Sequence, residues 1–366
     1  MPHLQHKGIH IAALSCAVPA HVQKIELNEN DENFSYMKSF VRQIGITQRH
    51  ISVTEQTCVD TGYAAAVAAL KRAALEATDL DAVVFLTQTP DFNPGTSNSI
   101  LIQHRLGMRK DVLAFDVPLG CSAFPYGLNI CSSLMAQPSI NKVLMIIGDT
   151  HWCDYPNKES LLNSKKFMSG ESTTAAILDK QGADELDIAL YTDGSGYKYL
   201  FAPSFGARNK WRQYTNTARM PNGTIVGKGE YMDGIEITSF ATTTVVDSLK
   251  EFLNDRNETI DDYDGIVLHQ ANKQIVKTIA KRLNAGKDKV PSTLEKYGNT
   301  DGATVPTTIV DAYANCEKEK LKLLTCAFGV GLSWGIASLS IETKNIVPVI
   351  EVEDDRFTEG YVEPID

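Results

Sequence analysis

The sequence predicts a layered α/β fold built from two similar halves. Short apolar runs of strand length alternate with longer segments that have a helical pattern, and this alternation is typical of layered α/β proteins. The order of these segments in the first half of the chain recurs in the second half. The two halves share negligible sequence identity, so the duplication is predicted from the pattern alone.

The first half contains two predicted helix–strand units. An Ala-rich helix is expected within residues 59–77, and it leads into an apolar strand at 82–86. A Gly-Cys turn and a second helix then precede an apolar strand at 142–147. We place the end of this half near residue 180, so that it spans residues 1–180.

The second half, residues 181–345, repeats this order. A helix expected at 243–253 leads to a strand at 265–268, and a helix at 272–283 comes before a strand at 323–327.

Two segments fall outside the repeated pattern. Residues 202–235 are rich in Gly, Asn and charge, and are expected to form a long surface excursion of the kind that often serves as a lid or binding surface. Residues 346–366 form an acidic C-terminal tail, which we expect to be solvated.

Composition excludes several functional classes. The 366 residues are 43% hydrophobic, enough for a large core, and the net charge of -10 disfavours a general nucleic-acid binder. Seven cysteines without a CxxC pair predict neither a disulfide framework nor a metal site. The apolar stretches are too short to span a membrane, and the N-terminus lacks the apolar core of a signal peptide. We therefore expect a cytoplasmic protein with no metal and no cofactor.

Cys121 is the candidate nucleophile. It follows an apolar segment and Gly120, and a helix is expected to start directly after it. Backbone N–H groups and the dipole at a helix N-terminus favour a thiolate over a thiol. The competing interpretation is a small buried hydrophobe, which is the usual role of an unpaired cysteine.

Three further segments carry candidate site residues. His269 ends an apolar strand, where α/β proteins place ligand-facing groups, although a single histidine is more often structural. Asn299 follows Gly298 in a turn-rich segment, so it is either a site residue or a turn residue. The glycine-rich run at 328–335 follows a strand and would allow close approach of a substrate to the backbone, or only a tight turn.

Taken together, these segments resemble one enzyme family. Gly120-Cys121, His269-Gln270-Ala271-Asn272, Gly298-Asn299-Thr300 and the run at 328–335 are similar to the motifs of the β-ketoacyl-acyl-carrier-protein synthase III family. The resemblance covers roughly residues 8–343. It implies a thiolase-like duplicated five-layered α-β-α-β-α fold and a homodimer.

The resemblance also implies a mechanism. Cys121 would attack an acyl thioester, with the backbone N–H groups of Cys121 and Val330 as the oxyanion hole. His269 and Asn299 would then donate hydrogen bonds to the thioester carbonyl of a malonyl-type extender. Loss of carbon dioxide would leave a carbanion that attacks the acyl group on Cys121, giving a 3-oxoacyl product.

Departures from the family pattern point to a particular acyl carrier. Where many members of the family have a Trp that stacks on the adenine of coenzyme A, followed by an Arg, this chain reads Ser39-Phe40-Val41-Arg42-Gln43-Ile44-Gly45. Gln274 also stands where an Arg is common. The expected helix after His269 carries a basic stripe formed by Lys273, Lys277, Lys281 and Arg282. This stripe predicts docking of an acidic acyl carrier protein, so carrier-bound acyl thioesters are the expected substrates rather than coenzyme A esters.

Other departures bear on substrate shape. They are the run at 169–172, Asp301-Gly302 beside Asn299, and Val330 in place of a more usual glycine.

Several alternatives stay open. The same three residues could pass an acyl group to an oxygen, nitrogen or sulfur nucleophile without decarboxylation. A ketosynthase dedicated to secondary metabolism or to modification of surface glycans is also possible. A catalytically silent partner subunit is disfavoured because Cys121, His269 and Asn299 are all retained. A degradative thiolase is disfavoured because the segment 329–331 offers no second cysteine.

Overall fold

The structure is a computed structural model. It describes residues 3–30, 32–92, 95–151, 168–180, 184–202, 217–220, 223, 225–227, 231–354, 356–358 and 360. Much of the predicted surface excursion at 202–235 therefore lies outside the described residues. No helix in the described part is long and apolar enough to span a bilayer.

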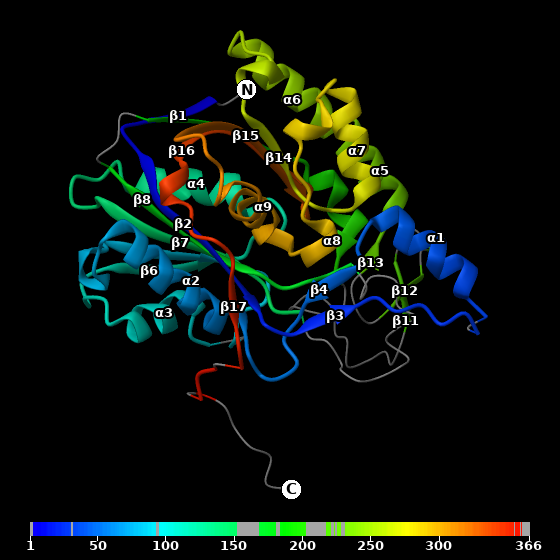
Figure 1. Ribbon diagram of the computed structural model, residues 1–366, viewed down its shortest axis with the longest axis horizontal. Helices are drawn as coiled ribbons and strands as arrows, with labels where there is room; N and C mark the ends of the chain where they lie inside the picture. The colour runs from blue at the N-terminus through cyan, green and yellow to red at the C-terminus, as the bar shows by residue number, and fades with distance from the viewer. Residues whose placement is uncertain are drawn as a thin grey trace, which may run out of the picture.

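Two β-sheets form the framework (Figure 1). The first contains, in spatial order, β17 (Ile350–Val352), β2 (His10–Pro19), β8 (Thr173–Asp179), β7 (Lys142–Gly148), β5 (Ala82–Leu86) and β6 (Leu113–Val117). The second contains β1 (His3–Lys7), β9 (Glu185–Thr192), β16 (Ser333–Glu342), β15 (Lys320–Gly329) and β14 (Gly265–Leu268).

The two sheets repeat one arrangement of four strands. β2-β8-β7-β5 in the first sheet and β9-β16-β15-β14 in the second have the same sequence of antiparallel, antiparallel and parallel pairings. The duplication predicted from the sequence pattern is thus present in the strand topology. The predicted seam near residue 180 falls between β8 and β9. Each sheet also takes an edge strand from the other end of the chain, β17 in the first and β1 in the second.

Helices complete five layers (Figure 1). α2 (Cys58–Ala73) and α3 (Asn98–Leu106) cover the outer face of the first sheet, and α4 (Ala123–Leu134) and α9 (Thr304–Tyr313) lie between the sheets. α5 (Gly234–Thr242), α6 (Thr244–Asp255) and α7 (Lys273–Arg282) cover the second sheet. Three apolar clusters fill the spaces between layers. Because both faces of each sheet are covered, the central strands are mostly buried and largely apolar.

The remaining elements lie around the edges of this framework. They are α1 (Phe34–Ile44), α8 (Leu294–Tyr297), and the strand pairs β3 (Val22–Lys24) with β4 (Gln48–His50), β10 (Leu200–Phe201) with β13 (Tyr231–Met232), and β11 (Thr217–Arg219) with β12 (Ile225–Gly227).

The C-terminal segment corrects one prediction. The tail from 346 was expected to be solvated, yet β17 pairs in parallel with β2 and closes an edge of the first sheet. The Phe357 ring stacks on the Arg105 guanidinium with 3.0 Å from carbon to ring centroid, and its backbone N–H donates to Asp60. Backbone pairing and one aromatic contact hold this acidic segment on the protein, and its high charge content gave no sign of either.

Candidate active site

Cys121 lies between the two sheets, on the turn that joins β6 to α4. The helix begins at Ala123, so Cys121 precedes its first helical residue by two positions. The side chain is buried. A Cβ atom added to Gly329, the last residue of β15, would lie 2.7 Å from the Cys121 sulfur. Glycine at this position therefore lets the end of β15 reach the sulfur, and it brings the following residue, Val330, to the same site.

His269 directly follows β14 and is buried, with 2% of its surface exposed. Its backbone N–H donates to Cys326 O, its ring lies edge-on to Phe328, and Nδ1 lies 2.6 Å from the Thr304 hydroxyl oxygen. Burial lowers the pKa of His269 to about 4, although the nearby charge of Asp301 acts in the opposite direction. The imidazole is therefore neutral at physiological pH.

Asn299 has a fixed amide orientation. Its Oδ1 accepts a hydrogen bond from the Asp301 backbone N–H at 3.0 Å, and its own backbone N–H donates to Met168 O. Because the amide oxygen is engaged by a backbone donor, the Nδ2 group is the end available to donate to a substrate.

Asp301 connects the candidate residues to a second histidine. Its Oδ1 lies 3.6 Å from the Cys121 sulfur, and its Oδ2 lies 3.2 Å from His151 Nε2. The Thr304 hydroxyl, which contacts His269, is also 3.0 Å from Asp301 O. Cys121 and His269, which are far apart in the sequence, thus both contact the segment 301–304, and Asn299 lies two residues before that segment.

His151 is embedded among carboxylates. Burial favours its neutral form, yet the Asp301 carboxylate 3.2 Å from Nε2, together with the charges of Glu171 and Asp149, raises the pKa of His151 to about 9. His151 is consequently an imidazolium at neutral pH. Its charge holds the pKa of Asp301 below the usual range, against the effect of burial.

No motif in the sequence marks His151 as a site residue. Asp301 was noted only as a departure beside Asn299. The other cysteines lack the Gly-Cys turn before a helix that singles out Cys121. Cys16, Cys58, Cys131 and Cys326 are buried and Cys316 is half-buried, while Cys153 lies outside the described residues.

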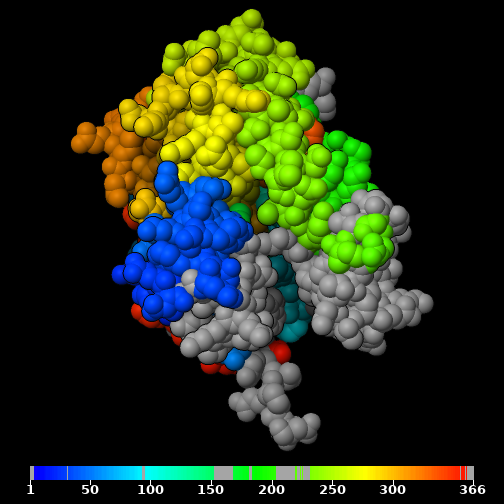
Figure 2. Space-filling view, turned by 90° about the vertical axis from the view of Figure 1, so that its right-hand side faces the viewer, coloured from blue at the N-terminus to red at the C-terminus, as the bar shows by residue number. Residues whose placement is uncertain are grey.

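The predicted docking residues lie on the surface of α7. Lys273, Lys277, Lys281 and Arg282 are all exposed. Figure 2 shows α7 (yellow) beside α1 (blue), and a Cβ atom added to Gly45, just after α1, would lie 2.7 Å from Lys273 Cβ. α1 therefore packs against the first turn of α7, next to the basic stripe.

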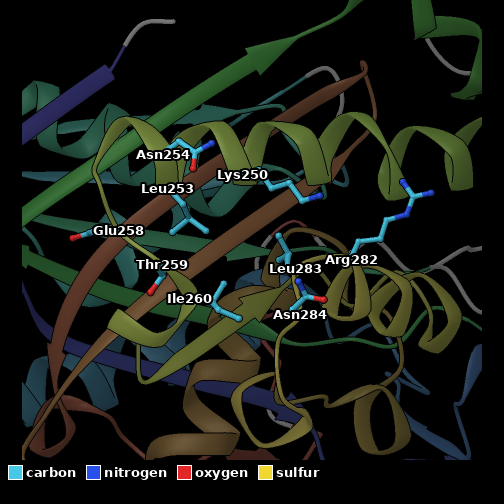
Figure 3. Close-up of a pocket in the computed structure, with 9 residues that line it drawn as sticks. All are labelled: Lys250, Leu253, Asn254, Glu258, Thr259, Ile260, Arg282, Leu283 and Asn284. Carbon is cyan, nitrogen blue, oxygen red and sulfur yellow. The ribbon is translucent and has the colours of Figure 1, made fainter.

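Arg282 differs from the three lysines. Its guanidinium donates to Thr242 O, and it lines a surface pocket of about 310 Å³ with Lys250 and Asn284 (Figure 3). Arg282 is therefore partly engaged in joining α7 to α5.

Comparison with solved structures defines the class of protein. The structure of a 3-oxoacyl-(acyl-carrier protein) synthase from Burkholderia xenovorans LB400 superposes with a TM-score of 0.84 at 27% identity, over 96% of this chain and 99% of that one. The protein is thus a thiolase-fold condensing transferase.

Sequence comparison gives the family. Residues 115–194 match the model of 3-oxoacyl-[acyl-carrier-protein] synthase III, and residues 253–341 match the model of its C-terminal part. The β-ketoacyl-[acyl-carrier-protein] synthase III of Campylobacter curvus is 31% identical over 84% of this chain and 90% of its own length. The β-ketoacyl-[acyl-carrier-protein] synthase III of Nostoc sp. is 32% identical over 91% of this chain and 98% of its own length. The chain belongs to the β-ketoacyl-[acyl-carrier-protein] synthase III family.

Proposed function

We propose that the protein transfers an acyl group from an acyl carrier protein to Cys121 and then condenses it with a malonyl-type carrier thioester. Carbon dioxide leaves, and the product is a 3-oxoacyl thioester. The observation that carries this proposal is that Cys121 and His269 both contact the short segment 301–304, which directly follows Asn299 and Thr300 in the chain. The relatives' names, which specify an acyl carrier protein, support the choice of carrier.

In the first half-reaction the Cys121 sulfur attacks the acyl carbonyl. The backbone N–H groups of Cys121 and Val330 form the oxyanion hole in this proposal, which the close approach of Gly329 to Cys121 supports. A buried sulfur protects the acyl enzyme from water.

In the second half-reaction His269 and Asn299 hold the carbonyl oxygen of the extender thioester. Both are neutral donors, so they stabilise the enolate that forms as carbon dioxide leaves. This role requires a proton on His269 Nε2, and hence a Thr304 hydroxyl that donates to Nδ1 rather than to Asp301 O. The hydroxyl lies 2.6 Å from Nδ1 and 3.0 Å from Asp301 O, so it can reach either acceptor, and the proposed role requires that it donate to Nδ1 when the extender is bound.

The second candidate function is acyl transfer to an oxygen, nitrogen or sulfur nucleophile without decarboxylation. One observation favours it, namely the Asp301 carboxylate 3.6 Å from the Cys121 sulfur. A neutral nucleophile needs a base, whereas decarboxylation supplies its own carbanion.

One experiment separates the two functions. The enzyme, acylated from an acyl carrier protein, is given a malonyl-carrier thioester labelled at its free carboxylate, and released carbon dioxide is counted. The proposed function requires one carbon dioxide for each 3-oxoacyl product. An acyl enzyme that releases no carbon dioxide, yet transfers its acyl group to an added alcohol, amine or thiol, would establish the second function instead.

The assembly and location form part of the proposal. A cytoplasmic homodimer is proposed, with the halves 1–180 and 181–345 of each chain enclosing one site. In the described part, β6 is the last strand of its sheet, and Leu113 on it is 44% exposed, so a second copy would cover this edge. Light scattering should give twice the chain mass, and a mass near 40 kDa would refute the dimer.

A further inference from the structure

The site contains a carboxylate and an imidazolium that take no part in the proposed mechanism of Cys121, His269 and Asn299. Asp301 and His151 form an ion pair directly beside Cys121, with Nε2 3.2 Å from Oδ2, and the other carboxylate oxygen faces the sulfur. The described residues contain no group of three or more His, Cys, Asp or Glu side chains placed to hold a metal ion. The pair must therefore be understood through its own acid–base chemistry.

The ion pair is held rigidly on both sides. The Asp301 backbone has a φ of +47°, a left-handed conformation that its N–H bond to the Asn299 side chain stabilises. On the other side, the His151 backbone N–H donates to Glu171 Oε1 at 3.0 Å, and Glu171 Oε2 accepts from the Ser52 N–H at 2.8 Å. The Asp301 carboxylate is thus pre-positioned against the nucleophile.

We infer that Asp301 is a further catalytic residue, which accepts the Cys121 thiol proton during acylation, with His151 as its positioning partner. The inference rests on the proposed role of Cys121 as nucleophile. It does not depend on which acceptor later receives the acyl group.

The proposed step balances. The Cys121 sulfur forms a bond to the acyl carbon, and its proton moves to Asp301 Oδ1. The tetrahedral intermediate then collapses, the bond from the acyl carbon to the carrier sulfur breaks, and the departing sulfur takes the proton from Asp301. The carrier leaves as a thiol, and Asp301 is again a carboxylate.

Charge explains why a carboxylate of lowered pKa is suited to this step. A negative charge 3.6 Å away opposes the effect of the helix N-terminus and disfavours a resting thiolate, and a thiol on Cys121 can donate to Asp301 Oδ1. The proton becomes strongly acidic only as the sulfur bonds to carbon, so a weak base is sufficient then. The positive charge of His151 keeps Asp301 ionised and cancels its repulsion of an anionic extender.

The first test is Asp301→Asn, because Asn tolerates a positive φ and preserves the side-chain shape. Acylation of the full enzyme by an acyl carrier thioester is followed in a single turnover by intact-protein mass spectrometry. The acylation rate should fall about 10²-fold. The pH midpoint of Cys121 alkylation by iodoacetamide should meanwhile move lower, since a nearby negative charge is lost.

These two readouts distinguish chemistry from structure. Acylation at the native rate would overturn the inference. So would acylation and alkylation that decline in parallel, because a damaged loop slows both. Asp288→Asn, the same change at an exposed carboxylate, is the matched control and should alter neither rate.

The second test is His151→Gln, which keeps a hydrogen-bond donor but removes the charge. Asp301 is faced by His151, His269 and Cys121, and His151 in turn is faced by Glu171 and Asp149. Without the imidazolium, the pKa of Asp301 should rise. The acid limb of the acylation pH profile should then move to higher pH, and an unmoved limb would contradict the pairing.

Failure of this inference can be told apart from failure of the proposed function. Asp301→Asn enzyme that has been acylated slowly to completion should still release carbon dioxide from the extender. If native enzyme acylates Cys121 but releases no carbon dioxide, the condensation is wrong while the role of Asp301 in acylation stands. If Cys121 never carries the acyl group, both are wrong.

Discussion

Two histidines at the ends of two strands approach the same carboxylate and acquire opposite properties. His269 follows β14 and contacts a hydroxyl, and burial lowers its pKa to about 4. His151 lies three residues beyond β7 and contacts Asp301, which with Glu171 and Asp149 raises its pKa to about 9. One imidazole is neutral and the other is charged at the same pH.

The nearest polar partner therefore sets the protonation state of each histidine, even though both rings are near the charge of Asp301. A hydroxyl offers no compensation for a buried cation, so His269 stays neutral and suits a donor to an enolate oxygen. An ionised carboxylate compensates the cation directly, so His151 suits charge balance. The protonation state of either histidine would change only if the group beside its ring changed.

The largest expected effect concerns Cys121, the group that both histidines are proposed to serve. Cys121→Ala should abolish the single acyl adduct that forms when the enzyme meets an acyl donor, because no other residue is proposed to carry it. Intact-protein mass spectrometry measures the adduct. An acyl adduct that persists in this variant would show that Cys121 is not the residue that carries the acyl group.

The next-largest effect concerns the second half-reaction, in which His269, but not His151, is proposed to act. His269→Ala and Asn299→Ala should each lower carbon dioxide release from the extender by roughly 10²–10³-fold, the usual loss for one oxyanion donor. Cys121 should still accept an acyl group in both variants. If both variants release labelled carbon dioxide at the native rate, His269 and Asn299 do not act in the decarboxylation step.

The pH dependence of stability sharpens the comparison further. The pKa of His151 is raised from 6.5 to about 9, so its contribution to stability is full below pH 6.5 and is lost as the pH rises through 9. The pKa of His269 is lowered to about 4, so its contribution is present above pH 6.5 and is lost as the pH falls through 4.

Urea unfolding of native enzyme and His151→Gln measures this difference. The native protein should lose stability between pH 6.5 and 9, and the variant should show a flatter dependence over that window. His269→Gln should leave the alkaline loss in place and change only the acid side. An identical alkaline loss in the His151→Gln variant would show that His151 is not charged in the folded protein.

The smallest effect lies at the surface, where charge is screened. Lys277→Glu with Lys281→Glu should raise the apparent KM for a carrier-bound donor several-fold and leave a small thioester mimic unaffected. The preference for the carrier over coenzyme A esters should weaken as salt rises. Lys71→Glu, on α2 in the opposite outer layer, is the control. Equal use of both donors, insensitive to salt and to the reversal, would contradict docking on α7.

Local pattern predicted much of this protein. The apolar strands and the helices between them were predicted because each depends on periodicity within a short window. α6 (Thr244–Asp255), for example, lies within a residue or two of the range expected from the sequence. The duplicated order, the five layers and the family were also predicted, since motifs such as Gly120-Cys121 and His269-Gln270 are contiguous.

Contacts between distant segments were decided only by the tertiary structure. Cys121 and Asp301 are 180 residues apart, and nothing beside either one signals that they meet. The same holds for the charge of His151, and for the C-terminal strand that pairs with β2. Sequence determined which elements form, because that choice depends on near neighbours. The fold determined which side chains share a carboxylate, and hence their protonation, because burial and charge act through space.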